Sequence, residues 1–159
     1  MGDSIPAMWM RGGTSKALYL LQTDISSDAA VRARLLLRIM GSPDRRQIDG
    51  LGGADPLTSK IAIISASDDP EADIDYLFLQ VAVDKAEVSD SQGCGNILAG
   101  VGPFAIERGL IKAEDPVTTV RIRMLNTGEY AEAEISTQNQ KVAFAGDESL
   151  DGVAEAAAA

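Results

Sequence analysis

Short runs of hydrophobic residues, separated by polar and glycine-rich turns, dominate the pattern along the chain. Runs of this length that are bounded by turn residues are typical of strands. They predict strands at residues 5–10, 17–21, 61–65, 74–83, 117–125, 129–135 and 141–145. The first two flank a polar turn at 11–16, so we expect them to pair as a hairpin.

Two segments carry helical periodicity instead. The first begins at Asp28 and ends at Gly41, because aspartate is a preferred N-cap and glycine a preferred terminator. Its apolar residues share one side, with arginines elsewhere on its surface: Val31, Leu35, Leu36 and Ile39, against Arg32, Arg34 and Arg38. The second, at 96–108, is apolar nearly all round and should be buried, with a kink or an early end at Pro103. Many mostly antiparallel strands around one buried helix predict an α+β fold.

Composition narrows the possible functions. The 159 residues suit one domain, which we place at 1–150, and the Ala-rich 151–159 are a frayed end or the point where a second domain would begin. A net charge of −10 disfavours nucleic acid as a partner. The absence of histidine removes histidine bases and histidine-ligated metals, and a single cysteine cannot form an internal disulfide. The pattern holds neither a membrane helix nor a secretory signal, which favours a cytoplasmic protein without a membrane partner.

Three loops of small and hydroxyl residues carry the candidate chemistry: 10–16, 52–60 and 91–96. Small residues let the backbone approach a ligand and direct its N–H groups at an anion. Each loop alone is more simply explained as a turn. Their combination in one chain indicates a binding site for a small molecule that bears carboxylates.

Two residues in these loops have reactive side chains. Cys94 directly precedes the predicted buried helix, where the free N–H groups of a helix start favour a thiolate or bind a carboxylate. The alternative is a small buried residue, although Gly93 and Gly95 beside it favour reactivity. Lys60 opens an apolar strand, where partial desolvation would suit a base, or it extends to solvent as most lysines do.

This set of groups suits removal of a proton next to a carboxylate and its return elsewhere on the molecule. Lys60 and Cys94 could act as base and acid for an allylic proton shift, with the developing charge stabilised by oriented N–H groups. Two other hypotheses stay open. One is a carboxylate-binding accessory module without catalysis, and the other is a cysteine nucleophile that Lys60 activates.

The loops also resemble a known family. Met10–Lys16 (MRGGTSK), Gly52–Lys60 (GGADPLTSK), Cys94–Asn96 with the helix after it, and Asn126–Gly128 are similar, in this order, to segments of the PrpF-type 2-methylaconitate cis–trans isomerases, which include 4-oxalomesaconate tautomerases. The resemblance implies one half of a diaminopimelate-epimerase-like fold, in which a β-barrel-like sheet wraps around a central helix. It also implies a cofactor-independent isomerase of unsaturated di- or tricarboxylic acids.

The resemblance implies roles for individual residues. Lys60 and Cys94 fall on the acid/base positions, with no metal. Substrate-binding positions fall on Arg11, Gly12, Gly13, Thr14, Ser15, Lys16, Thr58, Ser59, Gly95 and Asn96. Two residues depart from the family pattern: Gly93 replaces an asparagine and Ala17 replaces a glycine, and either change could alter substrate preference.

Members of this family are much longer, with the active site in a cleft between two halves. We therefore expect this chain to be an isolated N-terminal half with low activity alone, since an open cleft does not exclude water. The uncovered half-interface would expose an apolar patch. Its expected partners, besides the carboxylate, are a second copy of the chain or the missing C-terminal half.

Overall fold

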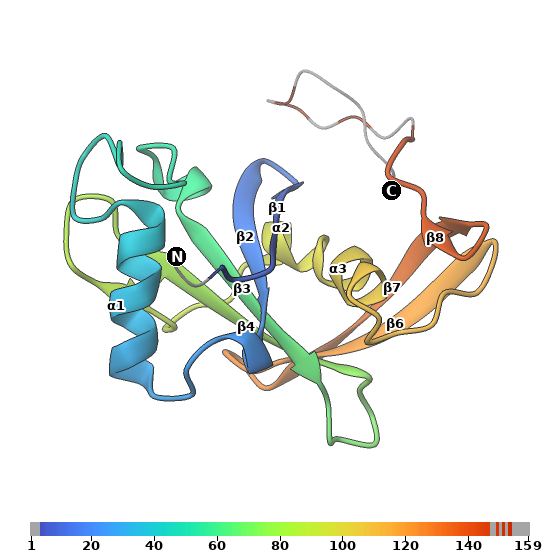
Figure 1. Cartoon of the computed structure of the whole chain (residues 1–159). Helices are drawn as coiled ribbons and strands as arrows, with labels where there is room; N and C mark the ends of the chain where they lie inside the picture. Colours follow the sequence, from blue (N-terminus) through green and yellow to red (C-terminus); the bar gives the residue numbers. More distant parts are fainter. Residues whose placement is uncertain (1–3, 147–148, 150, 152, 154–159) are drawn as a thin grey trace.

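The computed structural model describes residues 4–146, 149, 151 and 153, and its main feature is a curled mixed sheet (Figure 1). The strands run in the order β1-β2-β3-β4-β6-β7-β8, with β5 beside β4. Their bounds are β1 Ala7–Gly12, β2 Ser15–Leu21, β3 Lys60–Ala66, β4 Ile74–Val81, β5 Val88–Ser89, β6 Val117–Met124, β7 Glu129–Gln138 and β8 Lys141–Val142. Only the β2–β3 and β4–β6 pairs are parallel among the described strands, which confirms a mostly antiparallel α+β fold.

Alternation along the strands creates a core on each face of the sheet. On β2, Ala17 and Tyr19 face one core, whereas Leu18 and Leu20 face the other. The first core encloses helices α2 and α3 in the concave side of the sheet, and the second packs under helix α1 (Figure 1). Side chains of a strand point alternately to opposite faces, so the apolar residues of β2 and β3 serve both cores.

Helix α1 spans Ala29–Met40 and confirms the predicted limits. The Asp28 side chain accepts a hydrogen bond from the Val31 backbone N–H at 2.9 Å, and Gly41 ends the helix with φ +81°. The expected apolar face was partly wrong, because Val31 is 44% exposed whereas Leu36 and Met40 are fully buried. Residues four apart lie on one stripe of a helix, and the sheet contacts the stripe through 36 and 40.

The buried helix predicted at 96–108 is two segments, α2 (Gly95–Leu98) and α3 (Val101–Glu107). Pro103 explains the break at Ala99–Gly100. Because proline has no N–H, it cannot donate to the carbonyl four residues earlier, and it lies instead in the first turn of a new helix. Gly100 is also required at the break, since a Cβ there would lie 2.3 Å from the Tyr19 hydroxyl.

Several sequence-predicted limits shift. The first hairpin has a turn of only Gly13 and Thr14, because the ladder of β1 and β2 continues to the Gly12–Ser15 pair. Strand β7 runs on to Gln138, whereas β8 ends at Val142. Short 3-10 helices η1 (Gln22–Asp24) and η2 (Pro56–Thr58) were not predicted. Most of the Ala-rich 151–159 lies outside the described residues. No helix among the described residues has the length and apolar character to cross a bilayer.

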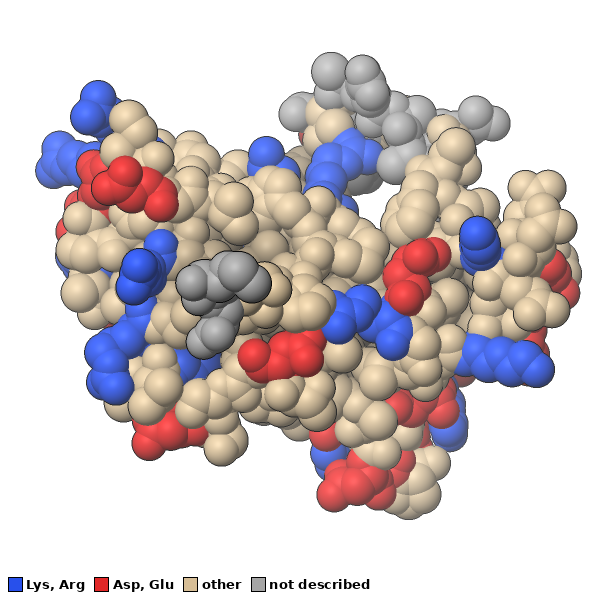
Figure 2. All heavy atoms as spheres, in the orientation of Figure 1, with Lys and Arg blue, Asp and Glu red and all other residues tan. Residues whose placement is uncertain are grey.

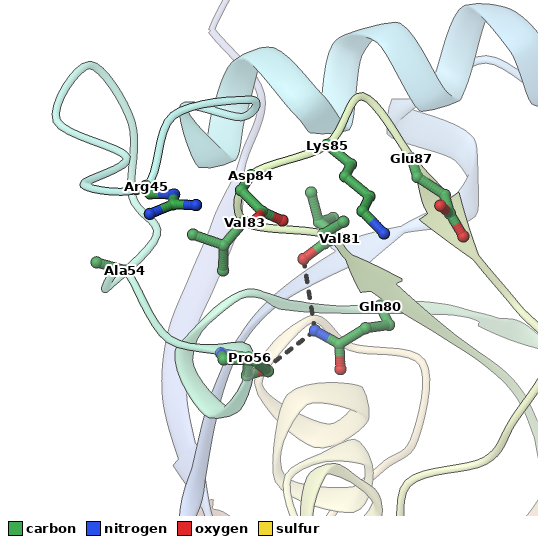
Figure 3. Close-up of a pocket in the computed structure, with 10 residues that line it drawn as sticks. Arg45, Ala54, Pro56, Gln80, Val81, Val83, Asp84, Lys85 and Glu87 are labelled. Carbon is green, nitrogen blue, oxygen red and sulfur yellow. Dashed lines mark hydrogen bonds between the residues drawn. The ribbon is translucent and has the colours of Figure 1, made fainter.

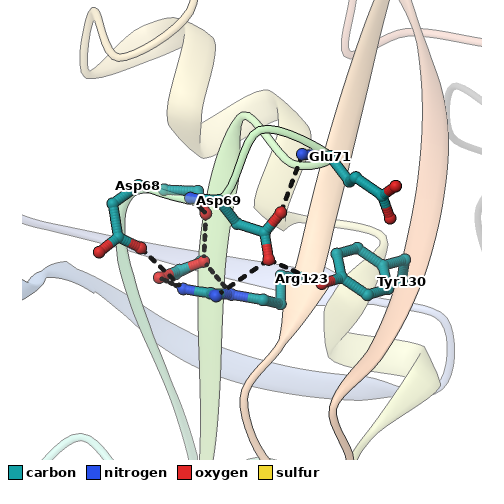
Figure 4. A network of polar contacts seen from close by, with 7 residues as sticks. Asp68, Asp69, Glu71, Arg123 and Tyr130 are labelled. Atoms are coloured by element: carbon teal, nitrogen blue, oxygen red, sulfur yellow. Dashed lines mark hydrogen bonds and ion pairs between the residues drawn. The ribbon is translucent and has the colours of Figure 1, made fainter.

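The turn between β3 and β4 is tied to β6 by arginine–carboxylate pairs and to β7 by a hydrogen bond from the Tyr130 hydroxyl to Asp69 (Figure 4). Arg123 contacts Asp75 at 2.6 Å and Asp69 at 3.1 Å. A hydrogen bond from the Glu71 backbone N–H, and a weaker effect of the one from the Tyr130 hydroxyl, stabilise the ionised Asp69. Both hold its pKa below the usual range. Acidic and basic side chains accordingly lie side by side at the lower edge of the molecule, over this turn (Figure 2). The network fixes the lower end of the sheet.

Candidate active site

The ammonium nitrogen of Lys60 lies 3.4 Å from the sulfur of Cys94. Lys60 is the first residue of β3 and is only 8% exposed, whereas Cys94 caps α2 and is half-buried. The two residues are 34 positions apart in the chain. The fold therefore brings together the two reactive side chains that the sequence singled out.

Strand alternation explains why Lys60 reaches this point. Ala62 and Ile64 line the core around α2 and α3, so Lys60, two residues before Ala62, points to the same face. Its ammonium lies 5.3 Å from the centre of the Phe78 ring, and the small Ala17 is its neighbour across the β2–β3 pair. A cation over an aromatic face is stabilised electrostatically, which holds the lysine in its buried position.

Asn96 joins the α2 start to the first loop. Its side-chain amide donates to the Thr14 hydroxyl at 3.1 Å and more weakly to the Ser15 hydroxyl at 3.5 Å. The loop fits against Asn96 only because it lacks side chains: a Cβ at Gly12 would lie 2.1 Å from the Asn96 carbonyl oxygen, and one at Gly13 would lie 2.4 Å from Oδ1. Two of the three predicted loops thus meet at Asn96.

The cations of the first loop take a different direction. Arg11 and Lys16 are paired on the hairpin and alternate with the residues that face α2. The Lys16 ammonium lies 5.5 Å from the centre of the Trp9 ring, and Trp9 packs against the core under α1. Strand alternation places both cations on the hairpin face away from Cys94.

The loop at 52–60 is shaped by hydrogen bonds among its own residues and Gln47. Asp55 accepts from the Leu57 N–H at 2.7 Å and so caps the short helix η2. The Ser59 side chain is fully buried and accepts from the Gln47 amide at 2.7 Å, and Thr58 donates to the Asp55 carbonyl at 3.2 Å. In this structure the Thr58 and Ser59 hydroxyls therefore hold the loop that precedes Lys60.

Gln47 and Asn126 are functional candidates to which the sequence analysis assigned no role. Gln47, buried at 1% exposure and with φ +45°, also accepts from the Ala54 N–H, so it fixes the second loop. Asn126 bonds the backbone of Phe78, under Lys60, and the carbonyl of Asp90, before Cys94. The sequence analysis singled out Asn126 only as part of the family-like segment Asn126–Gly128. No local sequence pattern pointed to Gln47.

Two tyrosines support the Cys94 segment from inside the core. The Tyr19 hydroxyl donates to the Ile97 carbonyl at 2.7 Å, and the Tyr76 hydroxyl donates to the Cys94 carbonyl at 3.3 Å. Burial raises the pKa of both phenols, and proximity to Cys94 raises it further. Both tyrosines are therefore neutral hydrogen-bond donors near pH 7, and they hold α2 without adding charge.

An open pocket of about 620 Å³ lies between the end of β4, the loop that follows it, and the segment with Ala54 and Pro56 (Figure 3). Gln80, directly opposite Lys60 on β4, borders it together with charged residues of the neighbouring loops: Arg45, Asp84, Lys85 and Glu87. Neither Lys60 nor Cys94 lines it. The two reactive side chains therefore lie outside this pocket. Within the described part of the chain, no three acidic or cysteine side chains gather closely enough to hold a metal ion.

Comparison with known proteins identifies relatives of the chain. The model of the PrpF protein family matches residues 3–159. The (4E)-oxalomesaconate Delta-isomerase of Novosphingobium sp. (strain KA1) is 61% identical over 95% of this chain and 42% of its own length. The solved structure of a methylitaconate-delta-isomerase is similar to this structure, with a TM-score of 0.93 and 50% sequence identity. The match covers 97% of this chain and 40% of the isomerase chain. A hydroxyproline epimerase from Agrobacterium vitis shares only the fold, with a TM-score of 0.56 and 14% sequence identity. That match covers 86% of this chain and 39% of the epimerase chain. The chain spans less than half the length of these relatives. The structural similarity confirms the predicted diaminopimelate-epimerase-like fold.

Proposed function

The chain belongs to the PrpF family, and on that premise we propose that it carries the acid/base pair of an isomerase for unsaturated di- or tricarboxylic acids. The observation that carries the proposal is the 3.4 Å contact between Lys60 Nζ and Cys94 Sγ. The relatives' names support the substrate class, since one is an oxalomesaconate isomerase and another a methylitaconate isomerase. The reaction is an allylic proton shift, of a 2-methylaconitate-like or 4-oxalomesaconate-like acid.

In the proposed reaction, one group removes a proton and the other returns one. The neutral amine of Lys60 takes a proton from the allylic carbon, and the electron pair delocalises toward the conjugated carboxylate or carbonyl. The Cys94 thiol delivers its proton to the far end of the allyl system. This leaves an ammonium and a thiolate, and a proton passing across their 3.4 Å contact restores both groups.

The start of α2 is the proposed site for a substrate carboxylate. The first helical hydrogen bond runs from the Leu98 N–H to the Cys94 carbonyl, so the N–H groups of Gly95 and Asn96 lie ahead of it. Both residues are exposed, and the Thr14 hydroxyl lies beside the Asn96 amide. We place Ser59 and Gln47 among the groups that position Lys60, because their side chains are buried against each other.

Deuterium exchange at the acidic carbon of (4E)-oxalomesaconate or methylitaconate, followed by NMR in D₂O, tests the proposal. The chain is assayed alone and also joined to the C-terminal portion of the Novosphingobium isomerase, because it spans 42% of that protein. We expect exchange in the joined protein, and its loss in Lys60→Ala and in Cys94→Ser. Lys85→Ala, an exposed lysine away from the pair, is the matched control and should retain exchange.

Two results would contradict the proposal. Exchange that survives in both Lys60→Ala and Cys94→Ser would show that other groups move the proton. Carboxylate binding by a folded joined protein without exchange would instead favour the accessory binding module. Circular dichroism of every variant separates loss of chemistry from loss of fold.

A further inference from the structure

We propose that Lys60 and Cys94 are the site of a reversible oxidative cross-link, a sulfenamide between Nζ and Sγ that peroxide induces. The inference goes beyond the proposed isomerase activity, because it requires the contact between the two atoms and no substrate. It concerns the chemistry of a sulfur and an amine held together in a chain that has no second cysteine.

The geometry of the pair suits bond formation. Reacting atoms held about 3–3.5 Å apart approach a near-attack arrangement, and Nζ lies 3.4 Å from Sγ. Lys60 is nine-tenths buried, at 8% exposure, and lies over the Phe78 ring. Within the described part of the chain, the sulfur is the hydrogen-bond partner that the structure gives this ammonium. The amine is therefore the nucleophile already in place when the sulfur is oxidised.

The sulfur can be reached by a small oxidant. Cys94 is half-buried and its two neighbours are glycines. A Cβ built at Gly95 would meet nothing within 4 Å, and one at Gly93 would meet only a methyl group of Thr127 at 3.6 Å. Because Cys94 is only half-buried and lies between two uncrowded glycines, a small oxidant such as peroxide can reach it while the lysine stays inside.

The chemistry proceeds in two balanced steps. The Cys94 thiolate attacks hydrogen peroxide: an S–O bond forms, the O–O bond breaks, and the released hydroxide takes a proton from the Lys60 ammonium and leaves as water. The sulfur loses two electrons to the peroxide and becomes a sulfenic acid. The neutral Lys60 amine then attacks the sulfur, so that an N–S bond forms, the S–O bond breaks, and a second water leaves with the amine proton. No second oxidant is needed.

The cross-link has a direct consequence for the pair. Both atoms are consumed, so neither can bind or transfer a proton until a thiol reductant cleaves the N–S bond and restores the thiol and the amine. The link also protects the sulfur, because an unresolved sulfenic acid proceeds to irreversible sulfinic acid. The lysine replaces the resolving cysteine that this chain lacks.

Mass spectrometry of the chain without substrate tests the proposal. Reduced protein is treated with hydrogen peroxide, and its intact mass is measured before and after dithiothreitol. We expect a mass about 2 Da below that of the reduced chain, which corresponds to the loss of two hydrogens. Proteolysis should yield one species that joins the peptides containing Lys60 and Cys94, and dithiothreitol should return both the mass and the free thiol.

Variants and a competing trap make the result specific. Lys60→Arg should lose the linked species and accumulate a sulfenic acid that dimedone captures. Lys16→Arg is the matched control and should keep the link, because Lys16 lies over Trp9. In the wild-type chain, dimedone present from the start should capture less sulfenic acid than in Lys60→Arg.

Three outcomes would overturn the proposal, and the first and third can be read in the wild-type chain independently of how a variant folds. One is oxidation straight to sulfinic acid with no linked peptide. Another is equal dimedone capture with and without Lys60. The third is a link whose mass rises by about 14 Da, because a link that retains one oxygen is an N–O–S bridge or a sulfinamide and not the proposed sulfenamide. Failure of the isomerase assay would leave these readouts unaffected.

Discussion

The side-chain amide of Asn126 hydrogen-bonds both backbone polar groups of Phe78, accepting from its N–H at 2.8 Å and donating to its carbonyl at 2.9 Å. The regular pairing of β4 with β6 ends at Tyr76 and Met124, so this amide continues the ladder as an extra peptide group would. It also donates to the Asp90 carbonyl at 2.8 Å. One side chain thereby connects the strand beneath Lys60 to the loop that leads to Cys94.

Replacing Asn126 should loosen both attachments. Asn126→Ala removes three hydrogen bonds at a half-buried position, and we expect it to destabilise the chain by about 1–3 kcal/mol. Asn126→Asp retains an acceptor for the Phe78 N–H and should cost less. Urea denaturation measures the loss, and hydrogen exchange at the Phe78 amide locates it. Thr127→Ser is the control and should match the wild-type chain.

A methyl group at Gly12 should displace the start of α2. The Cβ of Gly12→Ala would lie 2.1 Å from the Asn96 carbonyl oxygen, a backbone atom that cannot turn away. We expect a loss of about 1–3 kcal/mol, typical of overpacking. Gly95→Ala is the matched control, since its Cβ would meet nothing within 4 Å. Thermal unfolding of the two variants should differ clearly, and equal stabilities would contradict the observed packing.

Tyr19 should make the chain sensitive to alkali. Burial raises its pKa in the folded state, whereas an unfolded tyrosine ionises near about pH 10. The unfolded chain then binds fewer protons than the folded chain, so stability falls as pH rises above about 10. Tyr19→Phe should cost about 1 kcal/mol at pH 7, from the lost bond to the Ile97 carbonyl, and should show a shallower alkaline decline. Identical slopes in urea titrations across this range would refute the prediction.

Asp73 should contribute to sensitivity in acid. It accepts three hydrogen bonds from Arg121, and these lower its pKa in the folded state. Its stabilisation is present above its unfolded value of about 3.9 and is lost as pH falls through the depressed folded value. The stability difference between wild type and Asp73→Asn should therefore be largest near pH 7 and should shrink with acidification. Asp84→Asn, at an exposed position away from Arg121, is the control variant in the same urea titrations.

Local patterns predicted most elements because capping and alternation act over a few residues. Asp28 and Gly41 marked the ends of α1, and the polar turn at 11–16 marked the first hairpin, although its ladder extends further into that turn. The break before Val101 was harder to predict from the sequence, because Pro103 indicates a shortened helix but does not fix where the chain bends. The orientation of Lys16 could have been found: it alternates with Ser15 and Ala17, which face the opposite side of β2.

The sequence by itself determined which groups are available: an acidic chain without histidine, one thiol, and lysines in small-residue loops. Only the tertiary structure placed Lys60 against Cys94 and set Gln47 and Asn126 as supports. The reason is physical, because strand periodicity is fixed by the local backbone, whereas the distance between residues 34 positions apart depends on how the whole sheet curls around its buried helices.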